Sequence, residues 1–426
     1  MGGGPPRRSV LGMPPTRTLF TFILAAFVIG SAVSFQPTPL EASFEPRPQQ
    51  SAVAAVPQKV SDSMLVVSAK EHALVMQDPS TGARTAFFRV GLSPESVAIS
   101  EDGRTAVVTN HGARLSGNSI CIVDLHATNL VRTIPLEVSR QNRDQSITKR
   151  SFYRPSGVTF VPGKKRVVVS CEVEGVLLLV DLVEARVIGD CMLNSGGSNA
   201  VIVDHSGRFA FVANRESGTV SVVRLDRMRL VKTIEAGGGP AGMALHPVRN
   251  EIWLANQNTN SISVIDVDKQ QERLEFACGA MPSDIAFTRD GEYALVVNMQ
   301  EGEISVFNSE SRNTHTVVKL ERVTRAQAEA RPVAMPGSFG RSPLPTRIMI
   351  GPDGEHAYVA TRRSDQLHEI DLSTWAVTRI MPTAIAPTDL AWSRVTRDIQ
   401  VETSSNEASR AARLSGSPSA AGAKKR

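Results

Sequence analysis

Two consecutive stretches of this 426-residue chain follow one pattern of short strands and turns. Residues 198–237 and 239–279 each begin with a short apolar run, and a polar turn then leads into a run that ends in asparagine, FAFVAN in one and EIWLAN in the other. Two more runs follow, TVSVV and LVKTIE in the first stretch and SISVID and RLEFAC in the second. Four short strands that recur about every 40 residues predict a four-stranded antiparallel sheet as the repeating unit.

The repeat continues along most of the chain. The residues that open the first strand of each repeat are Pro94, Pro155, Ser198, Pro240, Pro282, Pro345 and Pro387. The residues that close the second strand are Ser68, Asn110, Cys171, Asn214, Asn256, Asn298 and Thr361. Both series advance by 42 or 43 residues, except for one step of 61 and one of 63. The chain therefore contains seven repeats, with insertions of 19 and 21 residues.

The two ends of the array complement each other. The first repeat has no opening strand of the usual kind near Ala52, and the strand that begins at Pro387 has no second strand after it. We therefore predict an all-β fold, a seven-bladed β-propeller closed by the C-terminal strand pairing into blade 1 as its innermost strand. Such a closure leaves no free strand edge. In the alternative, AVAAVP is the first strand of blade 1 and the C-terminal strand stays unpaired.

The repeats resemble those of the YVTN family of β-propeller proteins, which are similar in shape to WD40 propellers. The resemblance covers about residues 60–395 and rests on FVANRESGTVSVV, WLANQNTNSISVID and LVVNMQEGEISVF. It implies the propeller fold. It does not specify a function, because the family includes enzymes, redox subunits that carry cofactors, surface-layer proteins and binding modules.

The chain outside the repeats divides into three segments. In residues 1–35, arginines precede the apolar run LFTFILAAFVIGSAV, which predicts a secretory signal peptide or, if it is not cleaved, an N-terminal membrane anchor. Residues 36–60 are expected to be a Pro-rich linker, residues 61–395 the propeller and residues 396–426 a disordered basic tail. We therefore expect an exported protein, periplasmic or extracellular, whose contact with a membrane is limited to an uncleaved N-terminal segment.

Cysteine and histidine are too scattered to predict a metal or cofactor site. Cys121, Cys171, Cys191 and Cys278 have neither CxxC nor CxxCH spacing, and we expect buried free thiols, although the sequence leaves a disulfide open. No hydrolase, metalloprotease, P-loop or dinucleotide fingerprint stands at a suitable place. The sequence thus predicts no catalytic residue, no metal and no cofactor, and it favours a binding module over an enzyme.

Insertions and positive charge indicate which end of the ring is the binding face. In a four-stranded blade, the loop between strands two and three and the connection to the next blade emerge at one end, which we call the loop-rich end; the other turns emerge at the turn-rich end. All extra residues fall at the loop-rich end, and residues 138–154 and 322–347 each carry a net charge of +4. Such an end is typical of a binding surface, and its charge predicts an anionic ligand. The alternative is that these segments are solvated loops.

Two groups of residues are the candidates for ligand binding. The first is a single basic rim at the loop-rich end, with His111, Arg114, Arg140, Arg143, Lys149, Arg150, Tyr153 and Arg154. The second lies two residues after the opening residues of consecutive blades 6, 7 and 1, where Asp284, Arg347 and Asp389 stand. Arg347 should lie between the two carboxylates, either as a salt-bridge network across the closure or as part of a polar pocket.

The sequence therefore predicts an exported propeller that binds an anionic ligand or an acidic protein partner at its loop-rich, basic face. Nucleic acid is a further candidate ligand. The alternative function, an enzyme or accessory subunit of a periplasmic redox system with a cytochrome or quinoprotein dehydrogenase, rests on the family resemblance alone.

Overall fold

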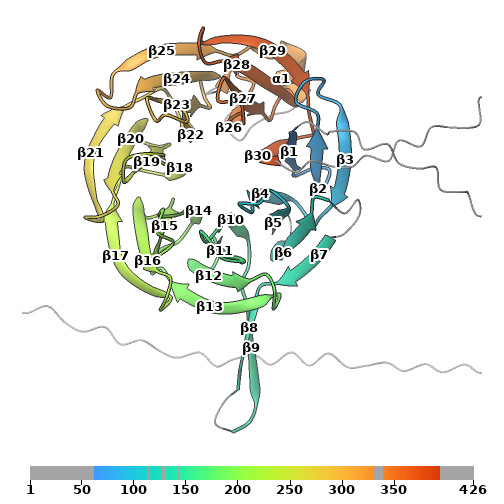
Figure 1. Cartoon of the computed structure of the whole chain (residues 1–426), viewed down its shortest axis with the longest axis vertical. Coiled ribbons are helices and arrows are strands. Elements are labelled where there is room, and N and C mark those ends of the chain that lie inside the picture. The colour runs from blue at the N-terminus through green and yellow to red at the C-terminus, as the bar shows by residue number, and fades with distance from the viewer. Residues whose placement is uncertain (1–61, 114, 127–130, 142–143, 331–338, 394–426) are drawn as a thin grey trace, which may run out of the picture. The chain divides into compact units, whose positions relative to one another are not determined.

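The computed structural model describes residues 62–393 apart from 114, 127–130, 142–143 and 331–338. Seven four-stranded antiparallel sheets stand around a ring (Figure 1). The sequence thus predicted the all-β, seven-bladed propeller correctly. The predictions for residues 1–35, 36–60 and 396–426 lie outside the described residues.

The four strands of each blade lie side by side from the innermost to the outermost. In that order, blade 1 contains β30 (Pro387–Ser393), β1 (Ser63–Ser68), β2 (Ala73–Gln77) and β3 (Arg84–Arg89). Blade 2 contains β4 (Pro94–Ile99), β5 (Thr105–Gly112), β6 (Ser116–Asp124) and β7 (Val131–Pro135). Blade 3 contains β10 (Pro155–Phe160), β11 (Arg166–Cys171), β12 (Val176–Asp181) and β13 (Arg186–Met192). Blade 4 contains β14 (Ser198–Val203), β15 (Phe209–Asn214), β16 (Thr219–Arg224) and β17 (Arg229–Glu235).

The remaining blades follow the same order. Blade 5 contains β18 (Pro240–Leu245), β19 (Glu251–Asn256), β20 (Ser261–Asp266) and β21 (Gln271–Ala277). Blade 6 contains β22 (Pro282–Phe287), β23 (Tyr293–Asn298), β24 (Glu303–Asn308) and β25 (Thr314–Lys319). Blade 7 contains β26 (Pro345–Ile350), β27 (His356–Thr361), β28 (Gln366–Asp371) and β29 (Ala376–Pro382). The innermost strand of each blade thus begins at the predicted opening residue. All second strands except β5 end at the predicted closing residue.

The ring closes through blade 1, as predicted. Strand β30 pairs with β1 in antiparallel register, with Val66 opposite Leu390 and Met64 opposite Trp392. It also contacts β26 of blade 7 and β4 of blade 2, so it completes the inner circle of strands. The C-terminal strand therefore joins the two ends of the chain, and neither end of the blade array is left as a free edge.

Apolar contacts between neighbouring blades form the core. Between blades 4 and 5, for example, Phe211 and Val222 pack with Leu254 and Ile265. The third strand β16 is buried on both faces because it lies between two blades, whereas the fourth strand β17 is mostly polar and faces solvent. The four cysteines all lie within the described residues and are free; Cys278 is half-buried and the other three are buried.

Asparagine side chains explain why the second strand so often ends in this residue. Asn214 Nδ2 donates to Ser221 Oγ at 2.8 Å, and Asn256 and Asn298 make the equivalent bond to Ser263 and Ser305 at 2.8 and 2.7 Å. Each bond joins the second strand to the third within a blade. The asparagines therefore stabilise the hairpins.

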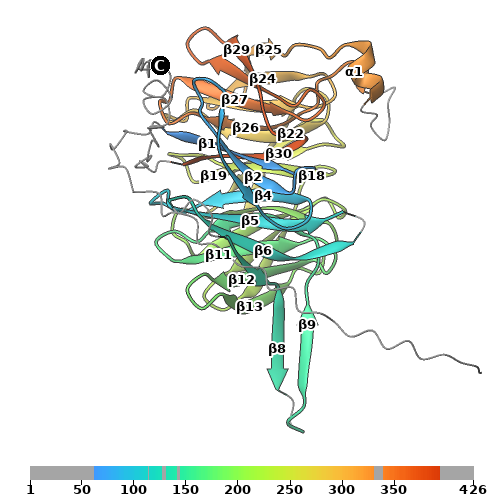
Figure 2. The ribbon, with the colours of Figure 1, turned by 90° about the vertical axis from the view of Figure 1, so that its right-hand side faces the viewer.

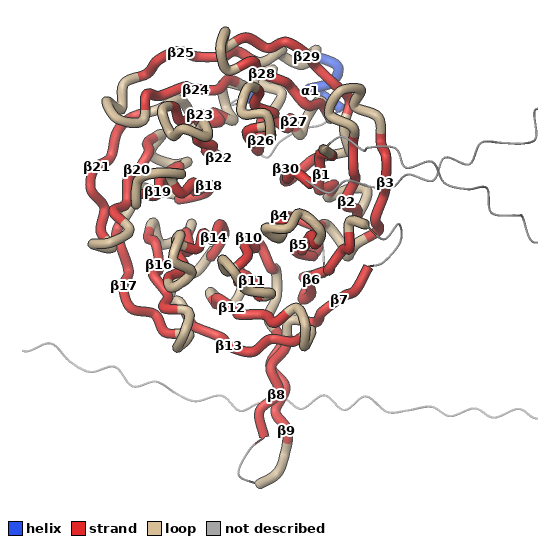
Figure 3. The backbone as a smooth tube through the Cα atoms, in the orientation of Figure 1, coloured by secondary structure: helices blue, strands red, loops and turns tan. Residues whose placement is uncertain are grey.

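The insertions add structure outside the seven sheets. The extra residues of blade 2 lengthen β5 and β6, and the connection after β7 forms a hairpin of β8 (Glu137–Gln141) and β9 (Ile147–Ser151) that projects outward beside β13 (Figures 1 and 2). We call this hairpin the arm. The connection between blades 6 and 7 contains α1 (Arg325–Ala330), the one α-helix among the described residues (Figure 3). No helix in the described part of the chain is long and apolar enough to cross a membrane.

Candidate functional site

His111 and Glu172 form a hydrogen-bonded pair at the loop-rich end. Each directly follows the closing residue that the repeat predicts, Asn110 or Cys171, so the two occupy equivalent positions in neighbouring blades 2 and 3, although β5 continues to Gly112. His111 Nε2 lies 3.0 Å from Glu172 Oε2, and Nδ1 lies 3.2 Å from the carbonyl oxygen of Gly112. Because both ring nitrogens face acceptors, the imidazolium form, in which both nitrogens donate, satisfies this geometry.

Arg154 contacts the same carboxylate. Its Nε lies 3.2 Å from Glu172 Oε2. The backbone N–H of Arg154 donates to Gly117 O at 2.7 Å, and the N–H of Glu172 donates to Arg154 O at 3.0 Å. These bonds tie the long loop of blade 2, the connection into blade 3 and the loop of blade 3 together. The backbone therefore positions all three side chains.

Hydrogen bonds and neighbouring charges shift the pKa values of both members of the pair. Burial by itself would lower the pKa of His111, but the hydrogen bond to Glu172 and the nearby carboxylate of Glu95 raise that pKa above its ordinary value. The hydrogen bond from His111 holds the pKa of Glu172 below its ordinary value despite burial, and the charges of Arg154 and Arg215 act in the same direction. We call His111, Arg154, Glu172, Glu95 and Arg215 the His111 cluster. An oriented histidine with such neighbours is suited to hold an anion or transfer a proton.

Replacing Glu172 by Gln should lower the pKa of His111. The substitution removes the largest influence that raises this pKa, whereas burial and the charge of Arg154, which both lower it, remain. An NMR titration of the His111 imidazole measures the change. Glu174→Gln is the matched control, because the Glu174 carboxylate accepts the backbone N–H of Tyr153 and not the imidazole. An unchanged pKa in the Glu172 variant would show that the pair does not exist in solution.

Asp284, Arg347 and Asp389 form the arrangement that the sequence predicted. Arg347 Nη1 lies 3.5 Å from Asp284 Oδ1, and Arg347 Nε lies 3.3 Å from Asp389 Oδ1. Asp284 Oδ2 also accepts the backbone N–H of Ile348 in blade 7, and Asp389 Oδ2 accepts the N–H of Val97 in blade 2, at 3.0 and 2.9 Å. We call the three charged residues the axial triad. It links the inner strands of blades 6, 7, 1 and 2.

The axial triad is electrostatically coupled to the His111 cluster. Burial raises the pKa of Asp284 to about 6, although Arg347 opposes this rise. Burial would lower the pKa of Arg347, but the charges of Asp389, Asp284 and Glu95 raise it. Glu95 therefore acts on both His111 and Arg347. The equivalent positions of the other four blades hold the small residues Ser96, Gly157, Ala200 and Gly242.

The structure does not gather the remaining predicted residues around His111. On the arm, Arg140 Nη2 lies 2.9 Å from Asp190 Oδ1, and Lys149 Nζ lies 3.3 Å from Glu137 Oε1. The Arg150 guanidinium lies 5.0 Å from the ring centroid of Phe152. Tyr153, next to Arg154, is exposed at the loop-rich end. Arg114 and Arg143 lie outside the described residues.

A single basic rim is therefore wrong for Arg140, Lys149 and Arg150, which lie on the arm outside the ring (Figure 1). The physical reason is the packing of Val138 against the apolar cluster between blades 2 and 3. Arg140 shares its face of the hairpin with Val138, since the side chains of a strand alternate, and this face turns toward β13.

Sequence reasoning missed Glu95, Glu172 and Arg215. Arg215 Nη2 donates to Gln257 Oε1 at 2.7 Å, which continues the polar series into blade 5. The repeat itself carries a signal that could have found most of them. The residues directly after the seven closing residues are Ala69, His111, Glu172, Arg215, Gln257, Met299 and Arg362. Four consecutive members of this series, from His111 to Gln257, are polar.

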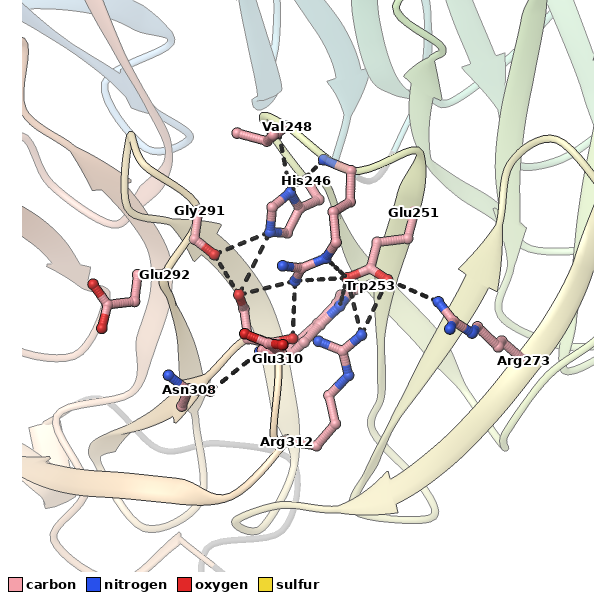
Figure 4. Close-up of polar contacts among 12 residues, drawn as sticks. His246, Val248, Glu251, Trp253, Arg273, Gly291, Glu292, Asn308, Glu310 and Arg312 are labelled. Carbon is pink, nitrogen blue, oxygen red and sulfur yellow. Dashed lines mark hydrogen bonds and ion pairs between the residues drawn. The ribbon is translucent and has the colours of Figure 1, made fainter.

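A second polar cluster lies at the turn-rich end, between blades 5 and 6 (Figure 4). Glu251, which is 3% exposed, accepts hydrogen bonds from Arg249 and Arg312 at 2.9 to 3.1 Å and from Trp253 Nε1 at 3.2 Å. Arg249 also donates to Ser309 of blade 6 at 2.9 Å. The buried carboxylate is thus paired within the protein, and we interpret this cluster as a structural link between two blades.

Among the residues that the structure describes, no group of three His, Cys, Asp or Glu side chains is arranged so that it could bind a metal ion. The His111 cluster combines one imidazole and the carboxylates of Glu95 and Glu172 with two arginines, whose charges oppose the binding of a cation. Such a set suits anions and proton transfer better than cations.

Comparisons with known proteins agree with the fold. The family described as Lactonase, 7-bladed beta-propeller, matches residues 180–284. Among solved structures, a periplasmic gluconolactonase from Pseudomonas aeruginosa has 14% identity and a TM-score of 0.59, with 78% of this chain and 99% of that chain covered.

Two further solved structures are similar. A functionally unknown protein from Desulfotomaculum acetoxidans has 14% identity and a TM-score of 0.61, with the same coverage of 78% and 99%. Hydrazine synthase from Kuenenia stuttgartiensis has 15% identity and a TM-score of 0.53, over 70% of this chain and 88% of that chain. At these identities the likeness shows the fold alone. The chain is therefore a seven-bladed β-propeller with a partial sequence match to the lactonase propellers.

Proposed function

We propose that the His111 cluster binds a small anionic ligand at the loop-rich end of the propeller. The observation that carries this proposal is the pairing of His111 with Glu172, in which both imidazole nitrogens face acceptors and the pKa is raised. The protonated imidazole then stands with Arg154 beside one carboxylate. A ligand carboxylate that displaces Glu172 can accept the charge-assisted hydrogen bonds that Glu172 now accepts.

Lactone hydrolysis is the second function that we propose for this cluster. The match to the lactonase family over residues 180–284 and the likeness to a gluconolactonase favour it. In this reaction, neutral His111 takes a proton from water while the water oxygen adds to the acyl carbon. The ring C–O bond then breaks, and the imidazolium returns the proton to the leaving alkoxide to give a hydroxy acid, which ionises to the hydroxycarboxylate and releases one proton to the solvent. Glu172 orients the imidazole, and Arg154 offsets the charge on the carbonyl oxygen.

The other expectations from the sequence remain proposals. We propose that the repeats are of the YVTN type, that the protein is exported, and that the cations of the arm meet an acidic partner such as a protein or nucleic acid. A role in a periplasmic redox system rests on the family resemblance, because the likeness to hydrazine synthase concerns the fold.

Isothermal titration with gluconate tests the binding proposal. His111→Gln and Arg154→Gln should each weaken binding by about 10-fold or more, since a hydrogen bond to a charged group contributes roughly 1.5–3 kcal/mol. Arg140→Gln is the matched control, because this arginine is also paired with a carboxylate but lies on the arm. Affinity that is equal in all three variants and the wild type would contradict the assignment of the site.

Acid release from glucono-δ-lactone, followed at constant pH, tests hydrolysis. We expect His111→Gln to slow the reaction by about 100-fold, the usual contribution of a general base. Gluconate binding without any acceleration of acid release over buffer would remove the hydrolytic function and leave the binding function intact.

A further inference from the structure

Five exposed apolar side chains belong to loops at the loop-rich end, in the part of the ring from blade 1 to blade 3. They are Ile385 (39% exposed), Leu92 (55%), Leu115 (77%), Tyr153 (39%) and Val173 (58%). We call these five residues the apolar arc. Contiguous exposed apolar surface is uncommon on a soluble protein and usually marks a binding surface.

The repeat shows that the arc belongs to one sector of the ring. Ile385, Leu92 and Tyr153 each stand two residues before an inner strand, namely β30, β4 and β10, which are neighbours in the ring. The same position before the next three inner strands holds Gly196, Gly238 and Ala280. Large apolar residues therefore occur where the His111 cluster lies, and small residues occupy the equivalent places on the far side.

Backbone contacts join the arc to the cluster. The N–H of Gly112, next to His111, donates to Leu92 O at 2.9 Å. Tyr153 precedes Arg154, and Val173 follows Glu172. Leu115 lies across the hairpin of β5 and β6 from Gly112. A Cβ atom on Gly112 would lie only 2.3 Å from the carbonyl oxygen of Leu115. Gly112 has φ of 86°, so this close approach requires glycine. Charged and apolar residues thus belong to adjoining loops.

The burial of the polar pair limits what the surface can accept. The His111 side chain is 14% exposed and that of Glu172 is 33% exposed, whereas Leu115 and Val173 are open to solvent. A small head group can reach the Arg154 guanidinium beside the pair, since that side chain is 43% exposed, and an attached apolar chain then lies along the arc. Burying each methylene of such a chain improves affinity about fourfold.

We infer that the ligand of the His111 cluster is an amphiphilic anion, with a carboxylate head held by Arg154 and, in place of Glu172, by His111, and an apolar chain that covers Leu92, Leu115, Tyr153 and Val173. This inference rests on the proposed anion-binding function. The inference specifies the chemical class of the ligand, because a purely polar anion would leave the apolar arc exposed to solvent.

Titration calorimetry with butanoate, octanoate and dodecanoate, each below its micelle concentration, tests the inference. Affinity should rise at least about tenfold from butanoate to octanoate. In a Leu115→Ser, Val173→Ser double variant this gain should disappear, while the affinity for butanoate is unchanged. A Val183→Ser, Val248→Ser double variant is the matched control, because these valines have a similar exposure, 66% and 73%, but belong to turns at the turn-rich end. Circular dichroism verifies that the variants fold.

The outcomes separate the two proposals. If no carboxylate binds, or if His111→Gln leaves all affinities unchanged, the anion-binding function itself fails. If the three acids bind equally, or if the gain with chain length survives in the Leu115, Val173 variant, the anion-binding function stands and the amphiphile is overturned. A further outcome is that the protein cosediments with phosphatidylglycerol vesicles and does not bind octanoate. That result would also overturn the amphiphilic ligand and would indicate that the apolar arc contacts a membrane surface.

Discussion

A chain that lacks residues 386–426 should fail to fold into a stable propeller. The deletion removes the whole inner strand of blade 1, and with it the pairing of Val66 with Leu390 and the contacts of Asp389. Leu390 is buried in the apolar cluster between blades 7 and 1. We expect a loss of more than about 5 kcal/mol, which reaches the total stability of many domains. Thermal unfolding followed by circular dichroism, together with the soluble yield, measures it.

Deletion of residues 397–426 is the control, because it removes no described strand. Its melting temperature should match that of the full chain. A synthetic peptide that covers residues 386–393 should partly restore the melting transition of the longer deletion, since the vacant edge of β1 can pair with an added strand. Equal melting temperatures for the two deletions would show that β30 does not close the ring.

The sequence predicted those features that depend on the repeat. Strand limits, blade number and closure follow from two positions per repeat, because each blade buries the same pattern of side chains against its neighbours. The axial triad was predictable for the same reason. Asp284, Arg347 and Asp389 occupy one register position of the inner strands, so the symmetry of the ring brings them together.

The sequence could not predict the parts that depart from the repeat. The 19-residue insertion follows no periodic rule, and its hairpin packs beside β13 through contacts such as that of the partly buried Val138 with the apolar cluster between blades 2 and 3. The charge of the segment therefore predicted a rim, although Arg140 and Lys149 are paired on the arm. His111 was a candidate from its loop, but its partner Glu172 depends on backbone bonds between loops of two blades.

Replacing Arg347 by Ala should destabilise the propeller at neutral pH by about 3 kcal/mol, the usual cost of breaking a buried ion pair. The variant leaves Asp284 and Asp389, both mostly buried, without the cation between them. A protein of this size should then melt roughly 5 °C earlier. Arg224→Ala is the matched control, because Arg224 is paired with Asp226 at the surface, and such pairs contribute about 1 kcal/mol or less.

A second substitution shows whether the lost stability comes from the carboxylates. Asp284→Asn removes one of the two negative charges, so the Arg347→Ala, Asp284→Asn double variant should melt later than Arg347→Ala alone. The changes in unfolding free energy of the two single variants should therefore not sum to that of the double variant, because the two residues interact directly. A double variant that is no more stable than Arg347→Ala would mean that the side chains of the triad do not meet.

The pH dependence of the same variant gives an independent measurement. The folded pKa of Asp284, about 6, is above its ordinary value, so between roughly pH 4 and 6 the folded state binds more protons than the unfolded chain. The contribution of Asp284 to stability therefore falls as the pH rises through this window. Without Arg347 the pKa of Asp284 should rise further, because the guanidinium charge lowers it. The deficit of Arg347→Ala relative to the wild type should thus be largest at neutral pH and shrink at pH 5, where a proton neutralises Asp284. A deficit that grows on acidification would instead place the uncompensated charge elsewhere.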